Sequence, residues 1–166
     1  MRIAVITISD RASKGIYADK SGPAIVAVLA AALPEAEIKT QIVPDDKEEI
    51  LEAFIKHGSA DWILTTGGTG PSPRDVTPEA SARYCDREVP GIADYLRIES
   101  LKETPNAVFS RGYAGLHGQQ FVVNFPGSVS GASFCARLMV PLLEHGTAMA
   151  KGEGHQGHEE HPGHLA

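Results

Sequence analysis

Apolar runs and polar breaks alternate along this chain in a way that is typical of strands alternating with helices. Runs rich in β-branched residues predict strands at residues 2–8, 37–43, 61–66 and 120–124. Longer segments with apolar residues at helical spacing predict helices at residues 21–33, 46–57, 78–85, 92–103 and 132–144, and residues 107–116 are irregular to strand-like. This alternation predicts an α/β fold with an open, largely parallel sheet.

Several predicted helix starts carry residue types that cap helices. Ser21, Asp46 and Thr77 stand at three of these starts, and Pro78 occupies the first helical position after Thr77. If Asp46 caps its helix, the preceding Asp45 is left without a capping role just past a strand end. We therefore take Asp45 as the functional candidate of the two aspartates.

Polar or glycine-rich loops follow the predicted strands. They cover residues 9–22, Asp45, residues 67–75 and residues 126–131. In open parallel sheets, ligands bind beyond the carboxyl ends of the strands. We therefore expect these loops to meet at one edge of the sheet and to form a single site for an anionic ligand.

The loop after the third strand carries the strongest chemical signal. It reads Thr65-Thr66-Gly67-Gly68-Thr69-Gly70-Pro71-Ser72-Pro73-Arg74-Asp75-Val76-Thr77-Pro78-Glu79. Its glycines allow sharp turns and a close approach to a ligand, and its backbone N–H groups with the following helix start favour anionic oxygens. Arg74 offers a cationic fork for phosphate, and Asp75 can hold a divalent cation. The alternative is a tight turn with a solvated ion pair, but hydroxyls, an arginine and an aspartate in one loop favour the anion site.

Length and composition exclude several classes of protein. The chain has 166 residues, 42% of them hydrophobic and 22% charged, which fits one globular domain. A net charge of -6 argues against a nucleic-acid surface, and no apolar run is long enough for a membrane span. The strand-like N-terminus shows no secretory signal, and Cys85 and Cys135 are interpreted as buried thiols. We therefore expect a cytoplasmic protein without nucleic-acid or membrane partners.

The composition changes at Gly146. We expect residues 1–146 to form the domain and residues 147–166 to be a flexible, histidine-rich tail. The tail histidines recur every three residues, at His155, His158, His161 and His164. Adventitious metal binding is the favoured interpretation of this spacing over a physiological metal site.

Familiar catalytic motifs are missing. No GxGxxG follows the first strand and no Gly-Lys dipeptide occurs, so neither a dinucleotide fingerprint nor a Walker A loop is present. Val129 stands where a nucleophile elbow requires serine.

Phosphate binding combined with aspartates predicts phosphoryl or nucleotidyl transfer, in which Asp45 and Asp75 share Mg²⁺. Further polar contacts could come from Ser9, Asp10, Thr69 and Ser128. For the cations Lys102 and Arg111, position alone favours a solvated surface charge.

Several segments together resemble one family. The loop from Gly67 to Ala80 resembles the signature of the molybdenum-cofactor biosynthesis proteins of the MogA and plant G-domain type. The other matching segments are Ile8-Ser9-Asp10-Arg11, Asp19-Lys20-Ser21-Gly22-Pro23, Val43-Pro44-Asp45, Ser100-Leu101-Lys102-Glu103-Thr104-Pro105, Phe109-Ser110-Arg111 and Asn124-Phe125-Pro126-Gly127. They span about residues 3–145. The tail is not part of the resemblance.

The resemblance implies a fold and an activity. The fold is a three-layer α/β/α sandwich with a mostly parallel central sheet. The activity is that of a molybdopterin adenylyltransferase, which uses ATP and Mg²⁺ to convert molybdopterin into adenylyl-molybdopterin and pyrophosphate. The assembly is a homotrimer, or a hexamer as in the related MoaB proteins.

The resemblance also assigns roles to residues. Asp45 and Asp75 are implied as catalytic, metal-holding residues. The nucleotide is implied to meet Ser9, Asp10, Gly67, Gly68, Thr69, Gly70, Pro126, Gly127 and Ser128. The pterin and its terminal phosphate are implied to meet Arg74, Ser100, Ser110 and Arg111. Many relatives have a proline where this chain has Val129, which bears on the contribution of Ser128.

A phosphate nucleophile simplifies the expected mechanism. A phosphate monoester has a second pKa of about 6 and is mostly dianionic near neutral pH, so it needs no general base. We therefore assign Asp45 and Asp75 to metal holding and alignment, and Arg74 and Arg111 to screening the two anions. The alternatives are a non-catalytic molybdopterin-binding or scaffold protein of the MoaB type, and a nucleotide hydrolase that turns over ATP without the pterin.

Overall fold

The computed structural model describes residues 1–153, and the predicted tail histidines His155, His158, His161 and His164 lie outside the described residues. The elements in chain order are β1 Arg2–Ile8, α1 Asp10–Ser13, α2 Ser21–Ala32, β2 Glu37–Val43, α3 Lys47–Lys56, β3 Trp62–Thr66, α4 Thr77–Tyr84, β4 Arg87–Glu88, α5 Pro90–Glu103, the 3₁₀ helix η1 Pro105–Phe109, β5 Ala114–His117, β6 Gln120–Phe125 and α6 Val129–Ala150. The predicted strands and helices are all present, with shifted boundaries.

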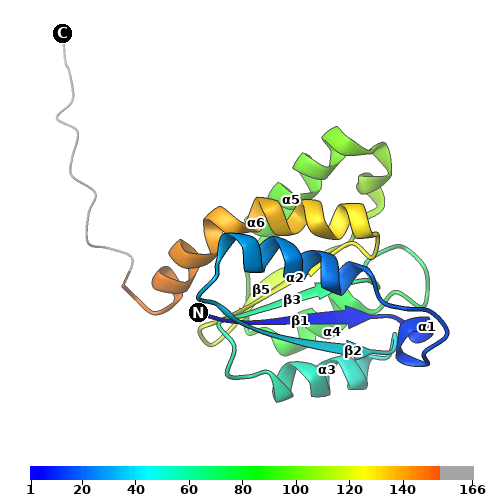
Figure 1. Ribbon diagram of the computed structural model, residues 1–166, viewed down its shortest axis with the longest axis horizontal. Coiled ribbons are helices and arrows are strands. Elements are labelled where there is room, and N and C mark those ends of the chain that lie inside the picture. The colour runs from blue at the N-terminus through cyan, green and yellow to red at the C-terminus, as the bar shows by residue number, and fades with distance from the viewer. Residues whose placement is uncertain (154–166) are drawn as a thin grey trace, which may run out of the picture.

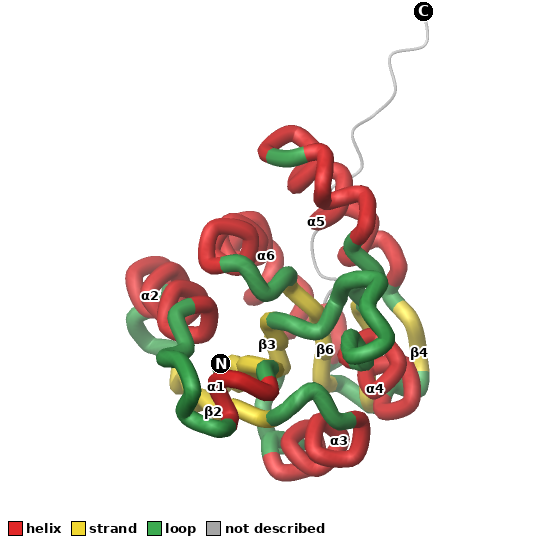
Figure 2. Tube along the Cα trace, turned by 90° about the vertical axis from the view of Figure 1, so that its right-hand side faces the viewer, coloured by secondary structure: helices red, strands yellow, loops and turns green. Residues whose placement is uncertain are grey.

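A mixed sheet forms the centre of the molecule. Its six strands follow the order β2-β1-β3-β6-β5-β4. The first four run parallel, whereas β5 is antiparallel to β6 and β4 is antiparallel to β5. Helices α2, α5 and α6 lie on one side of the sheet, and α3 and α4 lie on the other (Figures 1 and 2). The predicted three-layer α/β/α sandwich with a mostly parallel sheet is confirmed.

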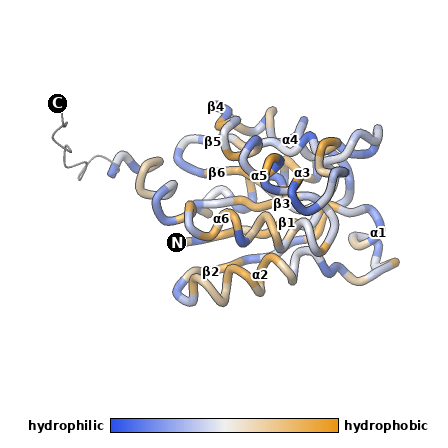
Figure 3. The backbone as a smooth tube through the Cα atoms, turned by 90° about the horizontal axis from the view of Figure 1, so that it is seen from above, coloured by the Kyte–Doolittle hydropathy of each residue, from blue (hydrophilic) through white to orange (hydrophobic). Residues whose placement is uncertain are grey.

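The unbroken apolar run of β1 results from burial on both faces of the sheet. Ile3 and Val5 point into the core beneath α2 and α6, whereas Ala4 and Ile6 point into the core beneath α3 and α4. Successive side chains of a strand point to opposite faces, so a strand covered on both sides needs apolar residues at every position. Helix α2 is hydrophobic along most of its length (Figure 3), and it packs against both β1 and α6.

The last helix is longer than predicted. It starts at Val129 and ends at Ala150, instead of covering residues 132–144. At its start, the Ser128 hydroxyl accepts a hydrogen bond from Gly131 N at 3.2 Å. Near its end, the Thr147 hydroxyl accepts from Trp62 Nε1 at 2.8 Å. The domain boundary predicted after residue 146 therefore falls inside α6.

Two of the three predicted caps are wrong. Asp46 caps α3 as predicted, because its carboxylate accepts from Glu48 N and Glu49 N. Helix α2 is instead capped by Asp19, whose carboxylate accepts from the backbone N–H of Ser21 at 3.0 Å. Thr77 does not cap α4, because its hydroxyl donates to Gly67 O at 2.9 Å, back into the glycine-rich loop.

Short elements account for the rest of the difference from the prediction. Helix α1, strand β4 and the 3₁₀ helix η1 each cover five residues or fewer, and β5 forms from the irregular stretch predicted at residues 107–116. Such short elements contain too few residues to show a period. Among the helices of residues 1–153, none combines the length and the apolar character needed to cross a bilayer.

Candidate functional site

The loops that follow β1, β2, β3 and β6 meet at the carboxyl edge of the sheet. Asp10, at the start of α1, and Asp45, after β2, exchange two hydrogen bonds: Asp10 N donates to Asp45 Oδ2 at 2.9 Å, and Asp45 N donates to Asp10 Oδ1 at 3.1 Å. On the other side, Thr66 Oγ1 donates to Pro126 O at 2.8 Å. Helix α1 lies beyond the arrowhead of β1 (Figure 1). The predicted convergence of these loops is therefore present.

Glycine is required where the loop after β3 passes the end of β1. Gly67 has a φ of 102°, and a Cβ atom on it would lie 2.2 Å from Ile8 O. Gly68 has a φ of 63°, and a Cβ atom there would lie 2.3 Å from Thr77 Oγ1. Both positions combine a left-handed backbone with a contact that leaves no room for a side chain. The loop is thus pressed against β1 and α4 in one conformation.

Asp45 and Asp75 border the same stretch of this loop. A Cβ atom on Gly68 would lie 3.1 Å from Asp45 Oδ1, and one on Gly70 would lie 2.8 Å from Asp75 Oδ2. Asp75 Oδ2 also accepts from Ser72 N at 3.0 Å, which fixes the carboxylate over its own loop. Burial raises the pKa of Asp45, and the negative charges of Asp10 and Asp75 raise it further. The two aspartates therefore lie on one side of the subunit.

The Arg74 side chain is paired with Asp10. Its Nη2 forms an ion pair with Asp10 Oδ2. The hydrogen bond from Arg74 holds the pKa of Asp10 below its ordinary value. Asp10 therefore bonds both Arg74 and the backbone N–H of Asp45. These two bonds join the loops that follow β1, β2 and β3.

Arg111 holds the glycine-rich loop from the other side. Its Nε donates to Gly70 O at 2.9 Å, its Nη2 donates to Asp75 O at 2.7 Å, and its backbone N–H donates to Thr69 O at 2.9 Å. Its Nη1 forms an ion pair with Glu79, which lowers the pKa of Glu79. The guanidinium thus bridges two carbonyls of the loop and the first turn of α4. Its contacts are not those of the solvated surface charge that position alone favoured.

A cavity of about 670 Å³ opens beside this loop, between α5 and the first part of α6. The predicted site residues that line it are Gly68, Thr69, Gly70, Asp75, Ser100, Ser110, Pro126, Gly127 and Ser128. The other predicted site residues do not line it, but they belong to the loops around it or bond to them. They are Ser9, Asp10, Asp45, Gly67, Arg74 and Arg111. Ser9 caps α1, because its hydroxyl accepts from Ala12 N at 3.2 Å.

Other cavity residues were missed by the sequence analysis. Asn124 lines the cavity and is 5% exposed, and its amide nitrogen donates to Thr65 Oγ1 and Ser81 Oγ at 3.0 and 2.9 Å. Helix α6 adds a row of lining residues, namely Ser130, Ser133, Phe134 and Arg137. Their spacing of three and four residues was the available signal. The buried residues of α6 include Ala136, Met139 and Leu143.

The atoms here that could act as ligands of a metal ion are mostly oxygens. The carboxylates of Asp45 and Asp75 and the hydroxyl of Thr69 are ligand types that Mg²⁺ prefers. In residues 1–153, no group of three or more histidine, cysteine, aspartate or glutamate side chains is arranged to hold a metal ion. Mg²⁺ is commonly held by one or two carboxylates together with substrate phosphates. The two aspartates match that kind of site.

Fold and site together define a class of protein: a three-layer α/β/α domain with a cavity at the carboxyl edge of its parallel strands, bordered by a glycine-rich loop and two aspartates. The sequence pattern of the family described as "Probable molybdopterin binding domain" matches residues 4–145. The chain belongs to this family.

Named relatives agree with that assignment. The chain is 37% identical to a molybdopterin adenylyltransferase of Helicobacter pylori over 164 residues, which cover 96% of this chain and 93% of the relative. It is 41% identical to the molybdopterin adenylyltransferase of Escherichia coli strain K12 over 131 residues, 76% of this chain and 67% of the relative. The crystal structure of the molybdopterin biosynthesis enzyme MoaB from Thermus thermophilus superimposes with a TM-score of 0.82 at 38% identity, covering 91% of this chain and 96% of that one.

Proposed function

We propose that this protein is a molybdopterin adenylyltransferase that acts in molybdenum cofactor biosynthesis. The reaction takes ATP and molybdopterin to adenylyl-molybdopterin and pyrophosphate. The names of the relatives support this activity. The observation that carries it is that Asp45 and Asp75 lie beside Gly68 and Gly70, two glycines that line a cavity large enough for a substrate.

The proposed chemistry is an in-line displacement at phosphorus. A terminal phosphate oxygen of molybdopterin attacks the α-phosphorus of ATP. The new P–O bond forms as the bond to the bridging oxygen of the β-phosphate breaks, and that oxygen leaves with pyrophosphate. No proton must be removed, since the attacking phosphate is mostly dianionic near neutral pH. The protein therefore has to position two anions and screen their charge.

The residues present fit a magnesium ion. Asp45 and Asp75 would hold it, and the missing side chains of Gly68 and Gly70 leave space next to both carboxylates. When bound, the ion supplies positive charge to the phosphate oxygens. Asp45 has a pKa raised by burial and by neighbouring carboxylates, so a nearby cation would also relieve an unfavourable charge in the folded protein.

We divide the remaining site residues into three groups. We assign the nucleotide to the first-loop and glycine-loop residues Ser9, Asp10, Gly67, Gly68, Thr69 and Gly70, and to Pro126, Gly127 and Ser128. We assign the pterin phosphate to the side of the cavity that carries Ser100 and Ser110. Arg74 and Arg111 act through their positive charge, because their guanidinium groups are already bonded to Asp10 and to the loop carbonyls.

A pyrophosphate-release assay tests the proposal. Purified protein, ATP, Mg²⁺ and molybdopterin should give pyrophosphate and adenylyl-molybdopterin in equal amounts, and omission of molybdopterin should stop release. Tight molybdopterin binding without release would indicate the non-catalytic, MoaB-type alternative. Release of phosphate or pyrophosphate from ATP alone would indicate a nucleotide hydrolase.

We also propose that the protein assembles as a homotrimer, with a hexamer as the alternative. Apolar side chains are exposed on α5 and η1, where an assembly could cover them: Tyr95, Ile98, Leu101, Val108 and Phe109 are 38–62% exposed. Light scattering coupled to size-exclusion chromatography should give the molar mass of three subunits. The variant Ile98→Asp should shift this mass towards that of the monomer. A monomeric wild-type protein would contradict this.

We also propose a cytoplasmic location. The two free thiols, Cys85 and Cys135, fit it.

A further inference from the structure

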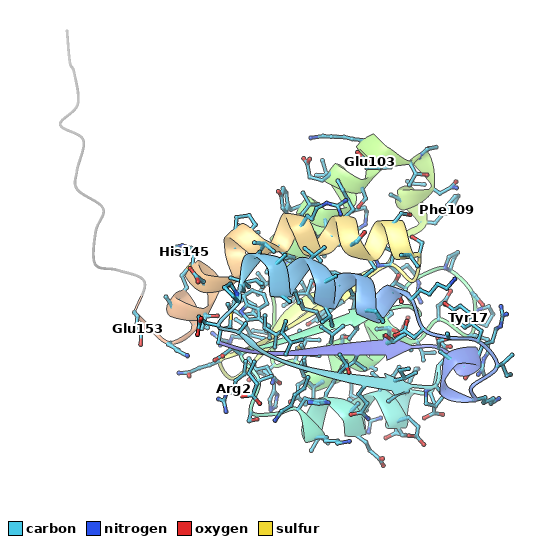
Figure 4. All side chains as sticks on the ribbon, in the orientation of Figure 1. Arg2, Tyr17, Glu103, Phe109, His145 and Glu153 are labelled. Carbon is cyan, nitrogen blue, oxygen red and sulfur yellow. The ribbon has the colours of Figure 1, made fainter. Side chains whose placement is uncertain are left out.

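The segment that carries Arg111, residues 110–113, belongs to no helix or strand. The chain reaches it by leaving α5 at Glu103 and passing through η1, which ends at Phe109 (Figure 4). Such a segment lacks the regular hydrogen bonds of a helix or a sheet, so its backbone groups need other partners. Arg111 N has one in Thr69 O, at 2.9 Å. The partners of the neighbouring carbonyls therefore help to set where the Arg111 side chain lies.

A side chain of α5 holds these carbonyls. Arg97 Nε donates to Ser110 O at 3.0 Å, and Arg97 Nη2 donates to Gly112 O at 3.3 Å. The two carbonyls belong to the residues on either side of Arg111, and within residues 1–153 Arg97 is their only hydrogen-bond partner. The third nitrogen, Nη1, donates to Asp94 at 2.8 Å. All three nitrogens of the Arg97 guanidinium are thus engaged within the protein.

The segment is also confined by β6. A Cβ atom on Gly112 would lie 3.1 Å from Asn124 O, so the segment runs close against this strand. Arg111 in turn donates to Gly70 O at 2.9 Å and to Asp75 O at 2.7 Å. Two arginines in series therefore connect α5 to the glycine-rich loop: one holds the backbone of the segment, and the other extends from that backbone to the loop.

We propose that Arg97 is a positioning residue. By holding the backbone on both sides of Arg111, it sets the Arg111 guanidinium on the glycine-rich loop and so fixes Asp75. This role rests on the proposed function, in which Asp75 holds the metal ion. A guanidinium suits the task, because its planar fork can hold two carbonyls in one fixed geometry, whereas an ammonium is a point charge. The alternative is a direct contact with a substrate, since Arg97 also lines the cavity.

A split between kcat and KM separates these two roles. Arg97→Gln should lower kcat about tenfold and raise the half-saturating Mg²⁺ concentration, because Asp75 is less well placed. The KM values for ATP and molybdopterin should stay within twofold of the wild-type values. A raised KM for molybdopterin with an unchanged kcat would overturn the proposal, because it would show that Arg97 binds the substrate directly.

Arg97→Lys separates the fork from the charge. This variant keeps the positive charge and the aliphatic stem, so it also serves as the test if Arg97→Gln folds poorly. Its kcat should fall about as far as that of Arg97→Gln, by about tenfold, since one ammonium does not replace the fork. A wild-type kcat in Arg97→Lys would overturn the proposal.

Arg87→Gln is the matched control. Arg87 Nη2 donates to Gly118 O at 2.6 Å, and Arg87 Nε lies 3.6 Å from Asp86 Oδ1. Arg87 thus also joins a backbone carbonyl to an aspartate, but it does not line the cavity. Its replacement should leave kcat, both KM values and the half-saturating Mg²⁺ concentration unchanged.

A double variant tests the route by which Arg97 acts. If Arg97 works through Arg111, the kcat of R97Q/R111Q should equal that of R111Q alone, because the second change removes a link that is already broken. Losses in kcat that multiply in the double variant would overturn the proposal.

Hydrogen exchange in the ligand-free protein tests the same link without the reaction. The amides of residues 67–77 should exchange about tenfold faster in Arg97→Gln than in the wild type, and at the wild-type rate in Arg87→Gln. Wild-type protein that releases no pyrophosphate would refute the adenylyltransferase, whereas faster exchange in Arg97→Gln would still support the link from Arg97 to the loop. Active wild-type protein whose Arg97→Gln variant keeps both kcat and the exchange rate would refute the positioning role alone.

Discussion

The glycine-rich loop and the helical wall of the cavity, formed by α5 and α6, are built in opposite ways. At the glycine-rich end, nearly every charged group already has a partner within the protein: Arg74 bonds Asp10, Arg111 bonds Gly70 and Asp75, and Asp45 accepts from Asp10. On helices α5 and α6, Glu103 and Arg137 line the cavity and have no ion-pair partner among the described residues. The first arrangement suits catalysis, because groups that act on a transition state need to be fixed beforehand. The second leaves the charged groups of Glu103 and Arg137 available to bond a ligand.

The largest effect is expected at the glycine-rich end, from a change that removes charge without loosening the loop. Asp75→Asn keeps an oxygen that can accept from Ser72 N, so the loop should keep its shape. Pyrophosphate release should fall about a thousandfold, as for the loss of a key electrostatic group, while molybdopterin affinity stays within twofold. Asp86→Asn is the control, since Asp86 also accepts a backbone N–H, that of Gly118, but does not line the cavity. Loss of molybdopterin binding by Asp75→Asn with the fold preserved would contradict the assignment.

A second prediction concerns how tightly the loop is pressed against β1. Gly67→Ala places a Cβ atom 2.2 Å from Ile8 O and should cost about 3 kcal/mol or more of the free energy of unfolding. Gly118→Ala also has a positive φ, but nothing lies within 4 Å of its Cβ position, so it should cost only about 1 kcal/mol. Urea denaturation of both variants provides the measurement. Equal losses would show that the backbone conformation, and not the contact with β1, sets the requirement for glycine.

Arg111 tests whether positioning at this end can be separated from binding. Arg111→Gln removes the bridge between Gly70 O and Asp75 O, and kcat should fall about tenfold to a hundredfold because Asp75 is less well placed. The half-saturating Mg²⁺ concentration should rise, and the dissociation constant for molybdopterin should change less than twofold. Arg83→Gln, which removes an exposed ion pair with Glu48, should leave all three quantities unchanged. A loss confined to molybdopterin affinity would show that Arg111 binds the substrate directly.

The smallest effect concerns the pH dependence of stability. Burial raises the pKa of Asp45 above its ordinary value of 3.8, so between that value and the raised pKa the folded protein binds more protons than the unfolded chain. Stability is therefore lost as the pH rises through this window, and Asp45→Asn should stabilise the free protein at pH 7 by less than about 1 kcal/mol, with the gain vanishing near pH 3.5.

Asp10 should respond in the opposite sense. Arg74 lowers the pKa of Asp10, so its contribution is present at neutral pH and is lost as the pH falls through the lowered value. Urea titrations of Asp45→Asn and Asp10→Asn at pH 7 and pH 3.5 compare the two. Destabilisation by Asp45→Asn at pH 7 would show that its hydrogen bond with Asp10 N outweighs the cost of burying its charge.

The parallel half of the fold could be predicted, because its strands are buried on both faces and appear as continuous apolar runs. The antiparallel edge could not, since β4 has two residues and β5 has four. Convergence of the loops on one edge followed from the parallel topology alone. The placement of Asp45 just past a strand end, next to a capping Asp46, was enough to single it out.

Other parts of the site lie beyond what residue types reveal. The contacts of Arg111 could not be predicted, because its partners are mostly backbone carbonyls and no side-chain pattern marks a carbonyl as an acceptor. Thr77 looked like a helix cap, but its hydroxyl instead holds Gly67 O. Asn124 sits inside an apolar strand, and only the fold shows that Thr65 and Ser81 surround its amide. In each case, tertiary contacts between distant segments decide the role.

The central claim is that Asp45 and Asp75 share one cation with the nucleotide phosphates. Electron paramagnetic resonance of Mn²⁺, titrated into the protein with a non-hydrolysable ATP analogue, tests it directly. The account predicts one nucleotide-dependent Mn²⁺ site per subunit, weakened about tenfold or more by Asp45→Asn and, separately, by Asp75→Asn. Mn²⁺ binding that is unchanged in either variant would contradict the account.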